Sequence, residues 1–163
     1  MLTKIHHHLP DENATAACGA ALADCLTPGL MIWLHGDLGA GKTALTRALL
    51  HAAGHAGSVK SPTYALAEPY RVQHPRLGSL SLLHFDLYRM SSPQEFIEAG
   101  LQDEVDGRNI CIVEWPEQGA GVLAAPDWRI TLTYLAQGRD FTLEACSERG
   151  TQCLNRFHFA ARL

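Results

Sequence analysis

Hydrophobic residues recur along the chain with two different periods, and these periods separate the expected helices from the expected strands. Between Pro10 and Pro28, apolar residues fall at every third or fourth position, which is the spacing of one face of an amphipathic helix. Asp11 is suited to begin this helix as an N-cap, because its side-chain oxygen can accept a hydrogen bond from an unpaired backbone N–H. The same spacing over residues 43–53 predicts a second helix, which ends at Gly54.

Short apolar runs without helical spacing predict strands. Residues 30–34 and 109–114 form such runs, and a strand that is apolar on both faces is expected inside a sheet. Residues 80–86 follow a turn-rich segment, so we expect them to form an antiparallel hairpin with residues 65–71. A further extended piece is expected over residues 58–62.

The remaining segments add a short helix and a second hairpin. A helix is expected from Pro93, a residue favoured in the first helical turn, to about Leu101. Polar and apolar residues alternate over 128–134 and 141–145, which indicates two paired strands with one face on the core. The signal after Cys153 is weak and predicts at most a short helix.

Length and composition indicate a globular protein. The chain has 163 residues, of which 47% are hydrophobic and 18% are charged. This length is typical of one domain, so residues 1–163 are expected to form a single domain. The net charge of −4 argues against a protein that coats nucleic acid, and DNA is not an expected partner. A small local basic site is compatible with this charge.

No targeting segment or disulfide framework is expected. The apolar stretch over residues 14–22 is shorter than the about 20 residues that cross a bilayer, and the N-terminus lacks the apolar core of a signal peptide. The five cysteines are odd in number and lack C-x-x-C spacing, which favours reduced and mostly buried thiols. The run His6–His8 has no carboxylate or cysteine at ligand spacing, so a solvated strand or terminus is expected there. We therefore expect a cytoplasmic protein that makes no membrane contact.

Residues 36–43 carry the sequence GDLGAGKT, which matches the phosphate-binding pattern G-x-x-x-x-G-K-[ST]. Its glycines let the loop curl so that backbone N–H groups point at phosphate oxygens, and the following helix adds its positive end. Lys42 can reach the β- and γ-phosphates, and Thr43 can place its hydroxyl on Mg²⁺. A strand is expected before this loop and a helix after it, which is the context that the motif requires. The chain is therefore expected to have a P-loop NTPase-like three-layer α/β fold with a mixed parallel and antiparallel sheet.

Two acidic residues stand at the ends of expected strands. Asp86 follows the apolar run 82–85, and Glu114 follows the run 110–113. A P-loop site needs carboxylates for the metal and for the attacking water, and ligands of open α/β sheets bind beyond the carboxyl ends of the strands. Either acid can be the one that binds the metal, and spacing alone does not decide between them.

Two further segments bear on the nucleotide. The sequence SPT at residues 61–63 is typical either of a switch ordered by the γ-phosphate or of an ordinary turn. Trp115 can stack on a base or a partner, although a tryptophan in this position more often packs against its own protein. The guanine-reading pattern N-K-x-D does not occur, so ATP is the expected nucleotide and Mg²⁺ the expected metal.

Four motifs, in this order, resemble the TsaE (YjeE) family of bacterial ATPases. They are the P-loop over 36–43, SPT at 61–63, HFDLYR at 84–89 and EWP at 114–116. The resemblance covers roughly residues 10–143, and HFDLYR and EWP are far more specific than the P-loop. It implies an ATP-hydrolysing accessory protein required for N6-threonylcarbamoyladenosine (t6A) modification of adenosine 37 in tRNA.

The resemblance also implies partners and residue roles. A complex of TsaD and TsaB homologues would stimulate a weak intrinsic ATPase, which links the chain to tRNA indirectly. Thr43 and Glu114 would bind Mg²⁺, and Lys42, Asp86 and Glu114 would be the catalytic residues. The residues expected to bind the nucleotide are Asp37, Leu38, Gly39, Ala40, Gly41, Lys42, Thr43, Ala44 and Trp115.

Two other functions are compatible with a chain that carries a P-loop. A small-molecule kinase fits the size, but kinases of this kind usually close an arginine-rich lid over the phosphates, and residues 119–125 carry almost no charge. The other alternative is a non-enzymatic module in which the bound nucleotide alone switches a surface that binds a partner.

Overall fold

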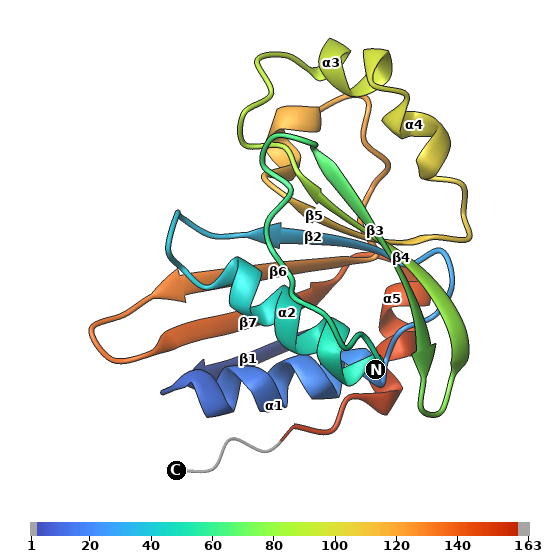
Figure 1. The fold of residues 1–163 in the computed structure, drawn as a ribbon. Coiled ribbons are helices and arrows are strands. Elements are labelled where there is room, and N and C mark those ends of the chain that lie inside the picture. Colours follow the sequence, from blue (N-terminus) through green and yellow to red (C-terminus); the bar gives the residue numbers. More distant parts are fainter. Residues whose placement is uncertain (1–2, 160–163) are drawn as a thin grey trace.

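The computed structural model describes residues 3–159 and, within them, a sheet of seven strands with helices on both faces (Figure 1). The strands are β1 (Lys4–Leu9), β2 (Met31–His35), β3 (Ala67–His74), β4 (Gly78–Asp86), β5 (Ile110–Glu114), β6 (Trp128–Tyr134) and β7 (Arg139–Ala145). The helices are α1 (Glu12–Ala23), α2 (Lys42–Ala52), α3 (Pro93–Glu98), α4 (Leu101–Glu104) and α5 (Glu148–Cys153), with the 3₁₀ helices η1 (Pro116–Gly119) and η2 (Leu154–Arg156).

The centre of the sheet consists of four parallel strands in the order β6, β2, β5 and β4. Strands β7 and β1 extend the sheet antiparallel at one edge, and β3 pairs antiparallel with β4 at the other edge. This confirms the predicted mixed sheet with parallel inner strands. Because the inner strands run the same way, the carboxyl ends of β2, β4 and β5 lie together, which is where α/β sheets bind their ligands.

Apolar side chains form a separate core on each face of the sheet. Helices α1 and α2 pack against each other on one face, where Leu22, Ile32 and Leu49 are almost completely buried. Helices α3 and α4 cover part of the other face, where Phe85 and Phe96 are buried. Burial of such a side chain contributes about 1.5–3 kcal/mol, so the two cores hold the three layers together.

The sequence correctly predicted how the first helix begins. The carboxylate of Asp11 accepts a hydrogen bond from the backbone N–H of Ala14 at 2.8 Å, and Glu12 adds negative charge to the positive end of α1. Helix α2 begins at Lys42, directly after the glycine loop and one residue before the predicted start.

The structure specifies one prediction about the middle of the chain and corrects another. The extended piece expected over residues 58–62 is not part of a strand. Arg47 of α2 instead donates a hydrogen bond to the carbonyl oxygen of Val59 at 3.2 Å, which attaches this segment to the helix. The helix that begins at Pro93 ends at Glu98, because Gly100 adopts a positive φ of 74° and a second short helix follows it.

The C-terminal helix begins earlier than the sequence predicted. The hydroxyl of Ser147 accepts a hydrogen bond from the backbone N–H of Gly150 at 3.0 Å and so caps α5. The part of the predicted helix beyond Phe159 lies outside the described residues. The indole N–H of Trp128 donates to the carbonyl oxygen of Gly150 at 2.9 Å, so α5 is fixed to the start of β6.

The run His6–His8 lies in the edge strand β1, as expected for a solvated strand. His6 and His8 face Asp140 of β7 at 3.7 and 3.5 Å, and His7 packs against Phe159 from the opposite face. Across residues 3–159, no three histidine, cysteine or acidic side chains are grouped closely enough to hold a metal ion. No helix in this part of the chain combines the length and the apolar character that a membrane span requires.

Candidate functional site

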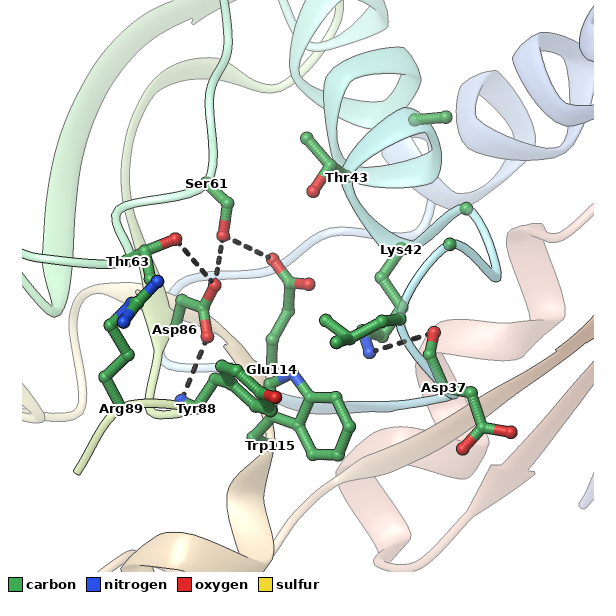
Figure 2. Close-up of a pocket in the computed structure, with 14 residues that line it drawn as sticks. Asp37, Lys42, Thr43, Ser61, Thr63, Asp86, Tyr88, Arg89, Glu114 and Trp115 are labelled. Atoms are coloured by element: carbon green, nitrogen blue, oxygen red, sulfur yellow. Dashed lines mark hydrogen bonds between the residues drawn. The ribbon is translucent and has the colours of Figure 1, made fainter. Parts of the chain in front are cut away.

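A cavity of about 440 Å³ lies at the carboxyl ends of β2, β4 and β5 (Figure 2). Its walls come from the glycine loop and the start of α2, from the segment before β3, and from the ends of β4 and β5. The lining residues are Asp37, Leu38, Gly39, Gly41, Lys42, Thr43, Ala44, Ser61, Thr63, Asp86, Tyr88, Arg89, Glu114 and Trp115. The predicted site residues all line this cavity except Ala40, whose side chain packs into the core under α1 and α2.

The glycine loop has the strand before it and the helix after it that its motif requires. Gly41 ends the loop with a positive φ of 101°, a conformation that glycine adopts without the steric cost of a side chain. Lys42 is buried, and its ammonium donates hydrogen bonds to the backbone carbonyls of Gly36 and Asp37. The same ammonium lies 4.1 Å from the centre of the Trp115 ring, so it is held between the loop carbonyls and this ring (Figure 2).

The charge of Lys42 is held in unfavourable surroundings. Burial lowers the pKa of this ammonium, and the nearby carboxylates of Glu114 and Asp86 partly counteract that effect by raising it. Backbone carbonyls and an aromatic ring solvate an ammonium less well than a fully charged anion does. A phosphate group in the cavity would therefore improve the surroundings of this lysine.

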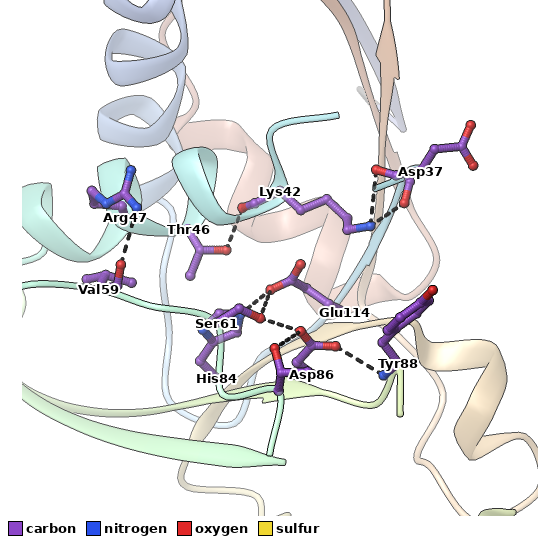
Figure 3. Close-up of polar contacts among 12 residues, drawn as sticks. Asp37, Lys42, Thr46, Arg47, Val59, Ser61, His84, Asp86, Tyr88 and Glu114 are labelled. Atoms are coloured by element: carbon purple, nitrogen blue, oxygen red, sulfur yellow. Dashed lines mark hydrogen bonds and ion pairs between the residues drawn. The ribbon is translucent and has the colours of Figure 1, made fainter. Parts of the chain in front are cut away.

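The two predicted strand-end acids are neighbours in the sheet. Asp86 and Glu114 are paired residues of the parallel strands β4 and β5, and their side chains are only 6% and 3% exposed. The hydroxyl of Ser61 donates to Asp86 and also lies 3.4 Å from Glu114, so it bridges the two acids (Figure 3). Asp86 further accepts a hydrogen bond from the backbone N–H of Tyr88 at 3.0 Å. Spacing in the sequence did not decide between the two acids, and the structure places both of them in the cavity.

The SPT segment is part of the site as well. Besides Ser61, Thr63 places its hydroxyl 3.5 Å from the Asp86 carboxylate. Arg47 of α2 binds the carbonyl oxygen of Val59, two residues before Ser61, and so ties the start of this segment to the helix (Figure 3). Helix α2 and the acids at the ends of β4 and β5 are thus linked through one short loop.

Sequence reasoning missed His84 as a functional residue. Its Nε2 lies 2.6 Å from Oε2 of Glu114, and both side chains are almost completely buried. The Nδ1 atom of this histidine is buried and has no hydrogen-bond partner among the described residues. A signal was present in the sequence: His84 and Asp86 stand two residues apart in a strand, hence on the same face, in an otherwise apolar run.

The rim of the cavity is aromatic and exposed. Trp115 has a positive φ of 57°, and its ring lies 4.9 Å from that of Tyr88. Arg89 also lines the cavity, but its guanidinium lies 4.9 Å from the centre of the Tyr64 ring, which is 85% exposed. The Asp86 carboxylate is contacted by Ser61, Thr63 and the backbone N–H of Tyr88, and within residues 3–159 it forms no ion pair with Arg89.

This donor set fits a nucleotide phosphate group with its divalent cation. The loop offers backbone N–H groups and a buried ammonium to anionic oxygens. The hydroxyl of Thr43 and the carboxylate of Glu114 face the same part of the cavity, as Figure 2 shows. Hydroxyl and carboxylate oxygens are the ligands that Mg²⁺ prefers in sites of this kind.

Comparisons with known proteins agree with this geometry. The sequence profile of the family "Threonylcarbamoyl adenosine biosynthesis protein TsaE" matches residues 9–141. The chain belongs to the TsaE family. The TsaE protein of Haemophilus influenzae is 35% identical to it over 161 residues, which is 96% of this chain and 99% of the relative. The TsaE protein of Synechocystis sp. is 42% identical over 113 residues, which is 68% of this chain and 69% of the relative.

A solved structure shows the same fold. The crystal structure of YdiB from Bacillus subtilis superimposes with a TM-score of 0.78 at 25% sequence identity, and the match covers 96% of this chain and 95% of YdiB. The TsaE relatives from both organisms are named as tRNA threonylcarbamoyladenosine biosynthesis proteins. The fold and the TsaE family are thus established over nearly the whole chain.

Proposed function

We propose that this chain binds ATP with Mg²⁺ and hydrolyses ATP to support the t6A modification of adenosine 37 in tRNA, together with TsaD and TsaB homologues. The observation that carries the proposal is the meeting of the P-loop lysine and two buried strand-end acids in one cavity. Membership of the TsaE family supports the link to tRNA threonylcarbamoyladenosine. The proposed reaction depends on ATP and tRNA, so we expect it to take place in the cytoplasm.

The glycine loop and α2 are the parts that would hold the phosphates. Backbone N–H groups at the start of α2 are free to point at anionic oxygens, and the helix presents its positive end to the same place. Lys42 would exchange its contacts with the carbonyls of Gly36 and Asp37 for phosphate oxygens. Such charge-assisted hydrogen bonds are stronger than those to neutral carbonyls.

Hydroxyl and carboxylate groups would bind the metal and position the attacking water. Thr43 and Glu114 are the residues that would bind Mg²⁺, and a bound Mg²⁺ neutralises charge on the transferring phosphoryl group. His84 holds the Glu114 carboxylate through the 2.6 Å contact. Asp86 is placed to orient a water and accept its proton, and the hydroxyl of Ser61 keeps its carboxylate facing the cavity.

The isolated chain is expected to hydrolyse ATP slowly. Among the described residues, Arg89 is the one arginine that lines the cavity, and it lies over the exposed ring of Tyr64. A well-placed arginine accelerates phosphoryl transfer by roughly 10³–10⁵. Docking of the TsaD–TsaB complex on this exposed rim is the proposed way in which a positive charge is supplied or Arg89 is redirected.

The test compares ATP hydrolysis by the wild type and by Lys42→Ala, with and without the TsaD–TsaB complex. We expect slow hydrolysis by the wild type, a clear increase with the complex, and loss of activity in Lys42→Ala while its circular dichroism spectrum stays unchanged. Wild-type turnover in the variant would rule out the assigned P-loop role, and a rate that ignores TsaD–TsaB would remove the proposed partnership.

The same preparations separate the alternative functions. ATP consumption that appears only with a phosphate acceptor would indicate a small-molecule kinase. Binding to TsaD–TsaB that depends on ATP, with no hydrolysis under any condition, would indicate a module that is switched by the nucleotide alone. Calorimetry that detected no uptake of ADP or ATP would eliminate all nucleotide-dependent functions.

A further inference from the structure

Arginines gather at the end of the molecule opposite the glycine loop. Figure 1 shows the loop between β2 and α2 at one end of the central strands, and α5 with the β3–β4 turn towards the other end. Two hollows at this second end have volumes of about 430 and 750 Å³ and share Pro28. Arg71 and Arg108 line the first hollow, and Arg149 and Arg156 line the second. We refer to these four arginines as the arginine face.

A close turn joins the two hollows into one surface. The backbone N–H of Gly29 donates to the carbonyl oxygen of Arg108 at 3.1 Å. A Cβ atom at Gly29 would collide with the carbonyl of Gly107 and would lie 2.9 Å from the Arg149 guanidinium. Arg156 donates to the carbonyl oxygens of Cys25 and Leu26 at 3.3 and 3.2 Å, which attaches η2 to the end of α1. The second hollow therefore has a fixed wall.

The acidic groups at this end keep their negative charge, but most of them are held by other partners and not by the four arginines of the arginine face. Asp106 accepts hydrogen bonds from the backbone N–H groups of Arg108 and Asn109 at 2.9 Å each, and Asp127 accepts from the Met31 backbone and from Ser147. Asp24 pairs with the neighbouring Arg76. Glu148 remains as an exposed acid beside the second hollow.

Three of the four guanidinium groups of the arginine face, by contrast, have no partner in the described part of the chain. Within residues 3–159, the side chains of Arg71, Arg108 and Arg149 make no ion pair and no hydrogen bond, and all three residues are exposed. A guanidinium keeps its charge at every physiological pH, so these exposed positive charges are accessible to an external anion. These exposed arginines lie close together although the chain as a whole has a net charge of −4.

The chemistry of the lining favours phosphate over an acidic peptide. The first hollow adds the hydroxyls of Ser79 and Ser81 and the side chain of Asn109 to its two arginines, and it contains one acid, Asp106. Its apolar members Leu80 and Ile110 are buried and Pro28 alone is exposed, so the surface offers few of the exposed apolar anchors on which peptide binding depends. Guanidinium forks and hydroxyls are the groups that bind nucleic-acid phosphates, and such contacts need no apolar anchor.

We propose that the arginine face binds the phosphate backbone of RNA, with tRNA as the ligand. The identity of this RNA rests on the proposed function, which concerns tRNA. The two hollows adjoin at the turn that contains Pro28, and together they offer separate positions for several anionic groups. A polymer with repeated phosphates can occupy both hollows, whereas one small anion can occupy only one of them. The site lies away from the nucleotide cavity, so we expect RNA and ATP to bind at the same time.

The test measures the fluorescence anisotropy of an unmodified tRNA transcript with the full chain at several salt concentrations. The double variant Arg71→Gln/Arg108→Gln is compared with the charge-matched control Lys4→Gln/Lys60→Gln, whose residues lie on the edge strand and before Ser61. We expect the arginine variant to lose about tenfold or more in affinity, and the slope of log K against log salt to fall by about 2, one for each lost phosphate contact. The control is expected to bind nearly as the wild type does.

Several results would overturn the proposal. They are the absence of tRNA binding by the wild type at low salt, an equal loss of affinity in the arginine variant and the control, and binding of polyglutamate in preference to tRNA. Saturation with ATP and Mg²⁺ that displaced the RNA would place it in the nucleotide cavity and overturn the proposal too. ATP hydrolysis is measured on the same variants: its retention without RNA binding would leave the proposed function standing, and RNA binding without hydrolysis would leave only this inference.

Discussion

The buried pair of His84 and Glu114 shows how a single side chain can orient a carboxylate that is proposed to bind a metal. The two side chains lie 2.6 Å apart and are shielded from water, so the carboxylate has little freedom to rotate. Groups that orient a metal ligand typically change metal affinity by about 10–100-fold when they are removed. We expect His84→Phe to weaken the Mg²⁺-dependent part of ADP affinity by about tenfold or more. Calorimetry measures the ADP affinity once with Mg²⁺ and once with a chelator, and the difference between the two affinities is the Mg²⁺-dependent part.

A conservative variant separates positioning from packing. The amide of His84→Gln can reach the position of Nε2 and donate to Glu114, so this variant is expected to keep more of the Mg²⁺-dependent affinity than His84→Phe. Both variants should bind ADP equally well in the chelator. A role in packing alone would instead lower the melting temperature of both and leave the Mg²⁺-dependent difference unchanged.

Motifs made the residues of the site predictable to different degrees. Lys42 and Thr43 follow from the P-loop, and Asp86 and Glu114 follow from their places at strand ends. The contact of His84 with Glu114 depends on the register of β4 against β5, which a strand pattern does not specify. The position of Arg89 over Tyr64 was equally inaccessible, because it depends on a loop conformation outside any periodic element.

At the scale of elements, the cap of α1 offers a direct test of a sequence signal. The Asp11 carboxylate satisfies the Ala14 backbone N–H at 2.8 Å, and loss of an N-cap usually costs about 0.5–2 kcal/mol. We expect Asp11→Ala to lower the free energy of unfolding by this amount, and Asp11→Asn to keep most of it because the amide oxygen can accept the same bond. Urea denaturation measures both. Equal losses in the two variants would show that charge, and not the hydrogen bond, is what stabilises the helix.

The elements that sequence reasoning placed correctly are those with a strong period or a clear boundary residue. The apolar runs of β2 and β5 and the helical spacing of α1 and α2 are of this kind. Residues 58–62 have no periodic pattern, and the burial of the Val59 side chain and the hydrogen bond from Arg47 to the Val59 carbonyl oxygen hold them in place. The break between α3 and α4 arises at Gly100, whose left-handed conformation a local pattern of apolar residues does not reveal.

At the scale of the whole molecule, buried thiols report on global stability. Burial raises the pKa of Cys18, Cys25 and Cys111 to about 12, so at neutral pH these groups are uncharged as well as shielded. Cys146 is exposed, and Cys153 is buried, so the predicted burial of the cysteines holds for all but Cys146. Alkylation of the native protein is therefore expected at Cys146 first, and at the buried thiols only when the chain opens.

This protection turns thiol labelling into a measure of nucleotide binding that does not depend on hydrolysis. A ligand that binds only the folded state lowers the open population by the factor 1 + [L]/Kd, which is about 100-fold when the ligand concentration is a hundred times Kd. ATP with Mg²⁺ should therefore slow the labelling of Cys111 by iodoacetamide, followed by mass spectrometry, and leave that of Cys146 unchanged. In Lys42→Ala the slowing should disappear, because the phosphates lose their buried ammonium. Labelling of Cys111 that is as fast as that of Cys146, or that ignores ATP in the wild type, would contradict the link between the cavity and the stability of the fold.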